Sequence, residues 1–138
     1  AVLPQMRIQR RGHIVNVSAL AAQVPFPDPV SASYAASKAA LESATRAVAL
    51  EAADAGIVVN AVAPGPVATQ MTASMPEFMK TRLQEKVPMR RWGGAEEIAS
   101  IVAFLASREC SFMTGQTLVA DGGLGMAALL EAGSGIRP

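Results

Sequence analysis

Residues 31–40, SASYAASKAA, hold the only tyrosine of the chain, Tyr34, and a lysine four positions later, Lys38. Their alanine-rich context, which continues to about residue 55, predicts a long helix. On a helix, residues four positions apart lie on the same face, about 6 Å apart along the axis. A phenol ordinarily titrates near pH 10, and an adjacent ammonium group favours the phenolate. The spacing is compatible with a proton-transfer pair, and equally with two solvated side chains that meet by chance.

Two short β-branched stretches flank this helix and predict buried strands. Residues 14–18, IVNVS, precede the helix, and residues 57–63, IVVNAVA, follow it. A strand, a helix and a second strand form a right-handed crossover unit with parallel strands. Residues 116–120 predict a third strand, after a helix at about residues 95–107. The chain is therefore expected to be an α/β protein with a three-stranded parallel sheet.

The remaining segments predict shorter elements and loops. A helix over residues 1–10 is expected to end at Gly12, because glycine favours the left-handed conformation that follows a helix. Three prolines between residues 19 and 31 exclude a helix or a central strand there. Residues 77–86 predict a short helix within an otherwise irregular stretch. Six residues of the central helix are expected to form an apolar face that packs against a sheet or another helix: Ala36, Ala39, Ala40, Ser43, Ala47 and Leu50.

Composition restricts the classes of function. The 138 residues fit one domain, residues 1–138, and the net charge of +1 gives no electrostatic case for nucleic acid or an anionic membrane. No apolar run of membrane-spanning length and no signal peptide is present, so a cytoplasmic location is expected. The hydrophobic share of 51% is high for a short chain, which predicts that another subunit or segment covers part of the surface. The single histidine, His13, offers no pattern for a hydrolytic triad.

Four motifs in order resemble the short-chain dehydrogenase/reductase family. Residues 34–38, YAASK, match its Tyr-x-x-x-Lys signature, and residues 14–18 resemble the strand that precedes it. Residues 59–69, VNAVAPGPVAT, resemble the strand and the Pro-Gly-x-x-x-Thr cofactor loop that follow. Residues 90–123 resemble the C-terminal part, in the manner of the 3-oxoacyl-carrier-protein reductase and sugar dehydrogenase branches. The resemblance implies the C-terminal part of a Rossmann-like, doubly wound parallel sheet, without its N-terminal dinucleotide half.

The resemblance also implies roles for individual residues. Tyr34 becomes the general acid/base, and Lys38 lowers the pKa of the phenol and holds the nicotinamide ribose. Hydride then moves between NAD or NADP and a carbonyl or alcohol substrate. The alternative interpretations are that Pro64-Gly65 is only a turn and that Thr69 is only a helix cap. The implied cofactor contacts are Tyr34, Lys38, Pro64, Gly65, Val67 and Thr69.

The sequence departs from the family pattern in two places. The catalytic serine of the family aligns with Ala19, which has no hydroxyl group, and Ser18 points to the opposite face of an extended chain. Loss of one oxyanion donor costs on the order of 10²–10³ in rate in other enzymes. Ser31 or Ser33 is the candidate substitute. No Gly-x-x-x-Gly-x-Gly loop precedes Tyr34, and the residue that selects NAD or NADP is missing with it.

Two functions follow as alternatives. The first is a truncated NAD(P)-dependent oxidoreductase, either active or inactive as an isolated chain. The second is a non-catalytic remnant that serves as an oligomerisation or interaction module. Either function predicts a homo-oligomer or a complementing N-terminal half, because a strand edge and apolar helix faces would otherwise be exposed.

Overall fold

The computed structural model describes residues 1–24 and 32–134, and the side chains of these residues up to position 129. Three parallel strands form one sheet in the order β1, β2, β3: β1 (Gly12–Val17), β2 (Ile57–Pro64) and β3 (Thr117–Ala120). The register pairs Gly12 with Ile57 and Val62 with Leu118. The expected three-stranded parallel sheet is confirmed, with strand ends that differ by one or two residues.

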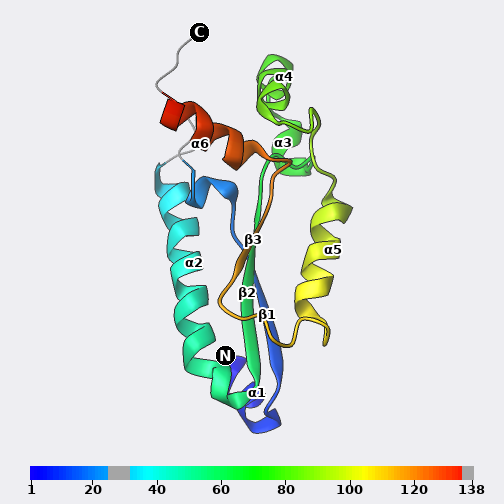
Figure 1. Cartoon of the computed structure of the whole chain (residues 1–138). Coiled ribbons are helices and arrows are strands. Elements are labelled where there is room, and N and C mark those ends of the chain that lie inside the picture. Colours follow the sequence, from blue (N-terminus) through cyan, green and yellow to red (C-terminus); the bar gives the residue numbers. More distant parts are fainter. Residues whose placement is uncertain (25–31, 135–138) are drawn as a thin grey trace.

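Two long helices enclose the sheet from opposite sides (Figure 1). Helix α2 (Ala32–Ala52) covers one face, and α5 (Ala95–Ala106) covers the other. A single 3₁₀ turn, η2 (Ala53–Ala55), extends α2 before β2 begins. The chain therefore runs strand, helix, strand, helix, strand, which is the connectivity that parallel pairing requires.

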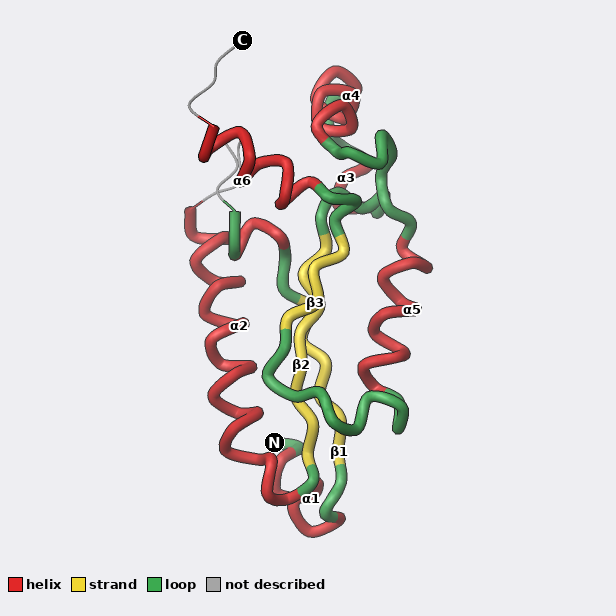
Figure 2. The backbone as a smooth tube through the Cα atoms, viewed as in Figure 1, coloured by secondary structure: helices red, strands yellow, loops and turns green. Residues whose placement is uncertain are grey.

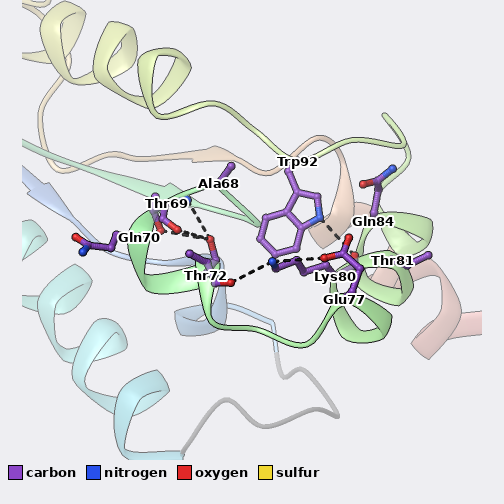
Figure 3. Close-up of a pocket in the computed structure, with 10 residues that line it drawn as sticks. Ala68, Thr69, Gln70, Thr72, Glu77, Lys80, Thr81, Gln84 and Trp92 are labelled. Carbon is purple, nitrogen blue, oxygen red and sulfur yellow. Dashed lines mark hydrogen bonds and ion pairs between the residues drawn. The ribbon is translucent and has the colours of Figure 1, made fainter.

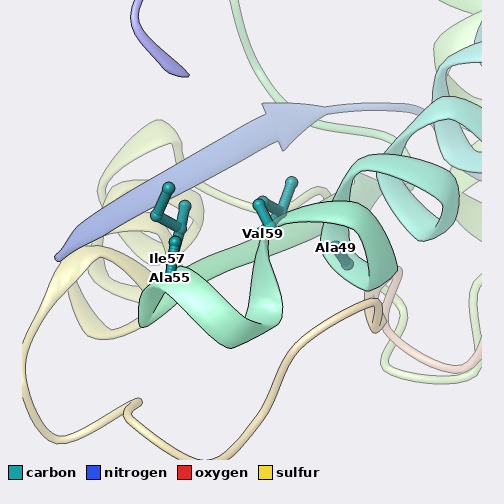
Figure 4. Close-up of a cluster of buried hydrophobic side chains, with 5 residues drawn as sticks. Ala49, Ala55, Ile57 and Val59 are labelled. Atoms are coloured by element: carbon teal, nitrogen blue, oxygen red, sulfur yellow. The ribbon is translucent and has the colours of Figure 1, made fainter. Parts of the chain in front are cut away.

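The central strand β2 supplies the core of both layers because its side chains alternate between the two faces of the sheet. Ile57 and Val59 pack against Ala49 and Ala55 on the α2 side (Figure 4). Val58 and Val62 belong to the α5 side, where Leu105 is the largest buried residue. A strand that is buried on both faces reads as a nearly continuous apolar run, as residues 57–63 do apart from Asn60.

One residue of β2 is polar and fully buried. Asn60 has 0% of its surface exposed. Its Nδ2 donates to the Met113 carbonyl oxygen at 2.6 Å, and its Oδ1 accepts from the Gln116 backbone N–H at 2.9 Å. The side chain therefore replaces backbone pairing where the loop before β3 passes the strand, and it satisfies two buried main-chain groups.

The N-terminal helix ends differently from the prediction. Helix α1 (Leu3–Gln9) is followed by Arg10 in the left-handed conformation, with φ of 52°. Gly12 is already the first residue of β1. A Cβ atom at position 12 would collide with the Sδ atom of Met6, so this glycine is explained by packing against α1. The expectation that Gly12 adopts the left-handed conformation is wrong.

The predicted apolar face of α2 does not pack against the sheet. The inward face of this helix carries Glu42, Thr45, Ala49 and Ala52, which are buried. Alanine occurs on every side of α2, so its distribution does not identify the buried face. The buried polar residues identify it, because each needs a partner beneath the helix. The six residues predicted to pack are exposed on the outer side: Ala36, Ala39, Ala40, Ser43, Ala47 and Leu50.

The smaller helices gather at the end of the molecule where the strands terminate (Figure 2). They are η1 (Leu20–Ala22), α3 (Gln70–Ala73), α4 (Glu77–Lys86) and α6 (Leu124–Ser134). Helix α4 has the predicted bounds, whereas α6 was not expected from its glycine- and alanine-rich sequence. Leu20, Val24, Val87 and Leu124 form a separate apolar cluster that joins these elements. None of the helices in the described part of the chain combines the length and apolar character that crossing a membrane requires.

Candidate functional site

Tyr34 and Lys38 lie together in the first turns of α2, beside the end of β1. The Lys38 Nζ atom is 5.8 Å from the centre of the Tyr34 ring, within the range of a cation–π contact. The same ammonium group donates a hydrogen bond to the carbonyl oxygen of Val17 at 2.8 Å. Val17 is the last residue of β1, so the strand end fixes the direction of the lysine side chain. The predicted placement of the two side chains on one helix face agrees with this geometry.

The residues after Val17 show where the serine of the family pattern would lie. Ala19 is buried in an extended conformation, with φ of −158°. Ser18 is 3% exposed, and its Oγ donates to Glu42 Oε1 at 2.8 Å. A single hydroxyl proton committed to a buried carboxylate is not available to a ligand. Ser33 lies in the first turn of α2, and Ser31 lies outside the described residues.

Pro64 and Gly65 lie at the same edge of the sheet, where the end of β2 is hydrogen-bonded to the end of β3. Pro64 is the final residue of β2, and the Gly65 backbone N–H donates to the Ala120 carbonyl oxygen at 3.0 Å. A Cβ atom at position 65 would lie 2.7 Å from the Cα atom of Asp121. The neighbouring backbone therefore leaves no room for a side chain, which explains the glycine without any ligand.

Asp121 follows β3 and organises the turn that starts α6. Its Oδ1 accepts from the Gly123 N–H at 2.8 Å, and its Oδ2 accepts from the Gly125 N–H at 2.6 Å. A carboxylate that accepts hydrogen bonds from the first N–H groups of a helix stabilises that helix. This contact links the Pro64-Gly65 turn to α6, and it explains why an unpredicted helix forms there.

Val67 and Thr69 lie in the loop that follows, which pairs with the segment before α5. Val67 forms a parallel bridge with Gly93, and the Gly93 N–H donates to the Pro66 carbonyl oxygen at 2.9 Å. Thr69 precedes α3, and its backbone N–H donates to Thr72 Oγ1 at 3.0 Å. Thr69 is therefore a helix cap, as one of its two interpretations predicts, and its exposed position also leaves it accessible to a ligand.

A shallow hollow of about 580 Å³ opens beside Thr69, between α3, α4 and Trp92 (Figure 3). The Trp92 indole N–H donates to the Lys80 carbonyl oxygen at 3.4 Å. Lys80 Nζ donates to the Ala73 carbonyl oxygen at 3.2 Å and lies 3.6 Å from Glu77 Oε2. Tyr34 and Lys38 do not line this hollow. The predicted site residues therefore lie at one sheet edge but in two separate places.

An ion pair fixes the loop that carries Trp92 to the start of α5. Arg91 donates to both carboxylate oxygens of Glu97, at 2.7 and 2.8 Å. The Gly94 backbone N–H also donates to Glu97 Oε2 at 2.8 Å. The hydrogen bond from Arg91, followed by that from Gly94, lowers the pKa of Glu97 from 4.5 to about 2. The pair is exposed, so its role is to orient the loop.

Two residues that sequence reasoning did not select are central to this edge. Glu42 is 5% exposed and lies one helical turn beyond Lys38 on the same face. Gln23 donates to its carboxylate oxygens at 3.1 and 3.2 Å. The spacing of eight residues from Tyr34 was the signal that would have found Glu42. Within the described residues, no group of three or more potential metal ligands occurs.

Comparison with known proteins gives a consistent result. A family model described as enoyl-(acyl carrier protein) reductase matches residues 1–125. The chain is 44% identical over 123 residues to the 3-oxoacyl-[acyl-carrier-protein] reductase of Thermotoga maritima, covering 89% of this chain and 49% of that protein. The chain thus spans about half the length of the curated relatives that it matches.

Solved structures show the same relationship. A 3-oxoacyl-[acyl-carrier protein] reductase with bound NAD from Brucella melitensis superimposes with a TM-score of 0.81 at 40% identity, over 89% of this chain and 44% of that one. A gluconate 5-dehydrogenase from Burkholderia cenocepacia, in complex with NADP and tartrate, gives a TM-score of 0.83 at 31% identity, over 89% and 48%. The three-stranded sheet with its flanking helices is therefore a Rossmann-like part of these larger folds. The chain belongs to the short-chain dehydrogenase/reductase family, and within it resembles the 3-oxoacyl-[acyl-carrier-protein] reductases.

Proposed function

We propose that this chain provides the proton-transfer and nicotinamide-side part of an NAD(P)-dependent oxidoreductase. The observation that carries the proposal is the position of the Lys38 ammonium group, held by the Val17 carbonyl oxygen beside the Tyr34 ring. A fixed cation beside a phenol is an arrangement that a proton-transfer residue can use. Membership of an oxidoreductase family supports the same reaction class.

The proposed step is the reduction of a carbonyl group, or its reverse. A nicotinamide, when bound, would supply hydride chemistry at the carbonyl carbon. The Tyr34 hydroxyl gives its proton to the carbonyl oxygen, which becomes the alcohol, and the adjacent Lys38 ammonium stabilises the phenolate left behind. Substrates of the relatives suggest a 3-oxoacyl thioester or a sugar-derived ketone, and we propose a substrate within the wider carbonyl and alcohol class.

The residues present fit one part of the cofactor. Lys38 would hold the nicotinamide ribose, and exposed Thr69 would meet a phosphate oxygen. Val67 would offer its backbone to the carboxamide, with Pro64 and Gly65 shaping the wall. NAD and NADP both occur in solved relatives, and we propose that either class of cofactor completes the site. No Gly-x-x-x-Gly-x-Gly loop precedes Tyr34 in this sequence, so the pyrophosphate would be held by a complementing N-terminal half or by another chain.

A homo-oligomer is the second part of the proposal. The outer face of α2 exposes small side chains together with Leu50, which is 83% exposed. Phe112 and Phe104 are exposed near the end of α5. Apolar patches of this kind are covered in stable assemblies. A monomer in sedimentation at micromolar concentration would contradict this part.

The alternative is a non-catalytic interaction module, and Ala19 favours it. The missing hydroxyl group removes the oxyanion donor that the family pattern places there. The module would retain the fold and its exposed helix faces, and it would have no measurable affinity for a reduced nicotinamide.

Cofactor fluorescence separates the two functions. The chain is titrated with NADH and with NADPH, alone and after co-expression with the N-terminal half of the Thermotoga maritima relative. Saturable binding in either form, weakened by Lys38→Met but not by Ser43→Ala on the outer face of α2, supports the oxidoreductase. Absence of saturable binding in both forms supports the module.

A further inference from the structure

The described part of the chain contains one buried carboxylate that the proposed reaction does not use, Glu42. It lies beneath the first turns of α2, where Tyr34, Lys38 and Glu42 follow one another at intervals of four residues on the same face. The Glu42 carboxylate faces the segment that follows β1, where Ser18 and Gln23 both donate hydrogen bonds to it. An acceptor with two donors from one neighbouring segment fixes that segment in place.

The segment held in this way is the one that receives the lysine. Ser18 directly follows Val17, whose carbonyl oxygen accepts the hydrogen bond from Lys38 Nζ. The Ser18 hydroxyl also lies 3.3 Å from the carbonyl oxygen of Lys38 itself. Val17, the last residue of β1, and Ser18, which follows it, therefore make three polar contacts with α2. A shift of Ser18 would carry the Val17 carbonyl group with it, because the two residues share a peptide plane.

We infer that Glu42 is a positioning residue: through Ser18 it holds the Val17 carbonyl oxygen where it aligns the Lys38 ammonium group toward Tyr34. The catalytic significance of this inference rests on the proposed function, whereas the geometry itself is independent of any cofactor. It also assigns Ser18 a structural task, which separates it from the missing hydroxyl group at Ala19.

Amine acylation tests the inference without turnover or cofactor. The folded 138-residue chain is treated with a limiting amount of acetic anhydride, and the rate at each lysine is measured by peptide mass spectrometry. Lys38 is compared with Lys80, which is held by the Ala73 carbonyl oxygen, and with exposed Lys86. A hydrogen-bonded ammonium group reacts more slowly because its proton must first be released from the acceptor.

Glu42→Leu keeps the volume of the side chain and removes both acceptor oxygens. We expect Lys38 to react about fivefold faster in this variant, the factor that corresponds to one ordinary hydrogen bond. The rates at Lys80 and Lys86 are expected to stay unchanged. Glu42→Gln retains an acceptor for Ser18, and Gln23 can rotate its amide to match, so this variant should restore the slow rate. Ser43→Ala, on the exposed side of the same helix, is the matched control.

An unchanged Lys38 rate in folded Glu42→Leu overturns the inference, and so does an equal rise at Lys80, which would mean general loosening. If Glu42→Leu does not fold, Ser18→Ala carries the same expectation, because it removes the donor that links the carboxylate to Val17. Failure of NADH binding would count against the proposed function but would leave these rates unaffected, so the two failures are distinguishable.

Discussion

The edge of the sheet that carries the site is held in one way near β1 and in another way near β2 and β3. Near β1, buried side chains hold the geometry: the Ser18 hydroxyl donates to Glu42, and the Asn16 amide donates to Thr45. Near β2, main-chain hydrogen bonds hold it, such as Gly65 N–H to the Ala120 carbonyl oxygen. A side-chain dyad therefore needs specific residues beneath it. A loop that is held through its backbone mainly requires that the neighbouring segments approach each other closely.

The largest expected effect concerns the dyad itself. Tyr34→Phe removes the hydroxyl group that is proposed to exchange the proton, so carbonyl reduction should fall by about 10²–10⁴-fold, the usual contribution of a general acid. NADPH oxidation, followed with the complementing N-terminal half present, measures the rate, and far-UV circular dichroism checks that the fold remains. Retained turnover would show that another group donates the proton. Ser43→Ala is the control that should leave the rate unchanged.

The backbone-held region should be most sensitive at Gly65. In Gly65→Ala the new methyl group meets the main chain of Asp121 at 2.7 Å, which neither segment can avoid by a rotamer change. We expect the free energy of unfolding to fall by about 1–3 kcal/mol, as for other overpacked sites. Urea denaturation measures it. Gly93→Ala is the matched control, because a Cβ atom there meets its neighbours only at 3.6 Å. Equal losses at both positions would contradict the close-approach explanation.

A smaller effect is expected where a buried side chain ties β1 to α2. Asn16 Nδ2 donates to Thr45 Oγ1 at 2.8 Å, and Thr45 Oγ1 donates to the Leu41 carbonyl oxygen. Thr45→Val keeps the shape and leaves the Asn16 amide without this acceptor, which should cost about 1–2 kcal/mol. The same urea experiment reports the change. A variant as stable as the parent would mean that the tie contributes nothing to the side-chain-held region.

The smallest effect is expected at the exposed pair of Arg91 and Glu97. The pKa of Glu97 is lowered from 4.5 to about 2, so the folded state favours the ionised carboxylate. Its contribution is complete above pH 4.5 and is lost as the pH falls toward 2. Glu97→Gln should therefore unfold like the parent at pH 2 and slightly more easily at pH 7. Added salt should reduce this small difference. A larger difference at low pH than at pH 7 would reverse the sign and refute the assignment.

Periodicity and composition were sufficient to predict the three strands, the helices α2 and α5 that alternate with them, and the bounds of α4. The same signals failed at α2, where alanines on all sides conceal the buried face. They failed again at α6, whose start depends on Asp121 accepting hydrogen bonds from residues ahead of it. The cap of α6 lies within four residues of Asp121 and was a local signal, whereas the buried face of α2 is set by contacts with distant segments.

The site shows the same limit. The contact between Tyr34 and Lys38 is local to one helix, and its spacing predicted it. Ser18 and Glu42 are 24 positions apart, so their pairing follows only from the docking of β1 against α2. Gly65 carries the family motif, but the reason for glycine lies 56 residues away, in the backbone of Asp121.

The single tyrosine and the single tryptophan fall in different regions of this edge. Tyr34 belongs to the side-chain-held dyad, whereas the Trp92 indole N–H donates to the Lys80 carbonyl oxygen of α4. Ultraviolet absorption of the phenol therefore reports one region, and indole emission reports the other. The natural sequence thus contains two separate optical probes. Binding at the dyad and movement of α4 can be followed independently, without introducing a label.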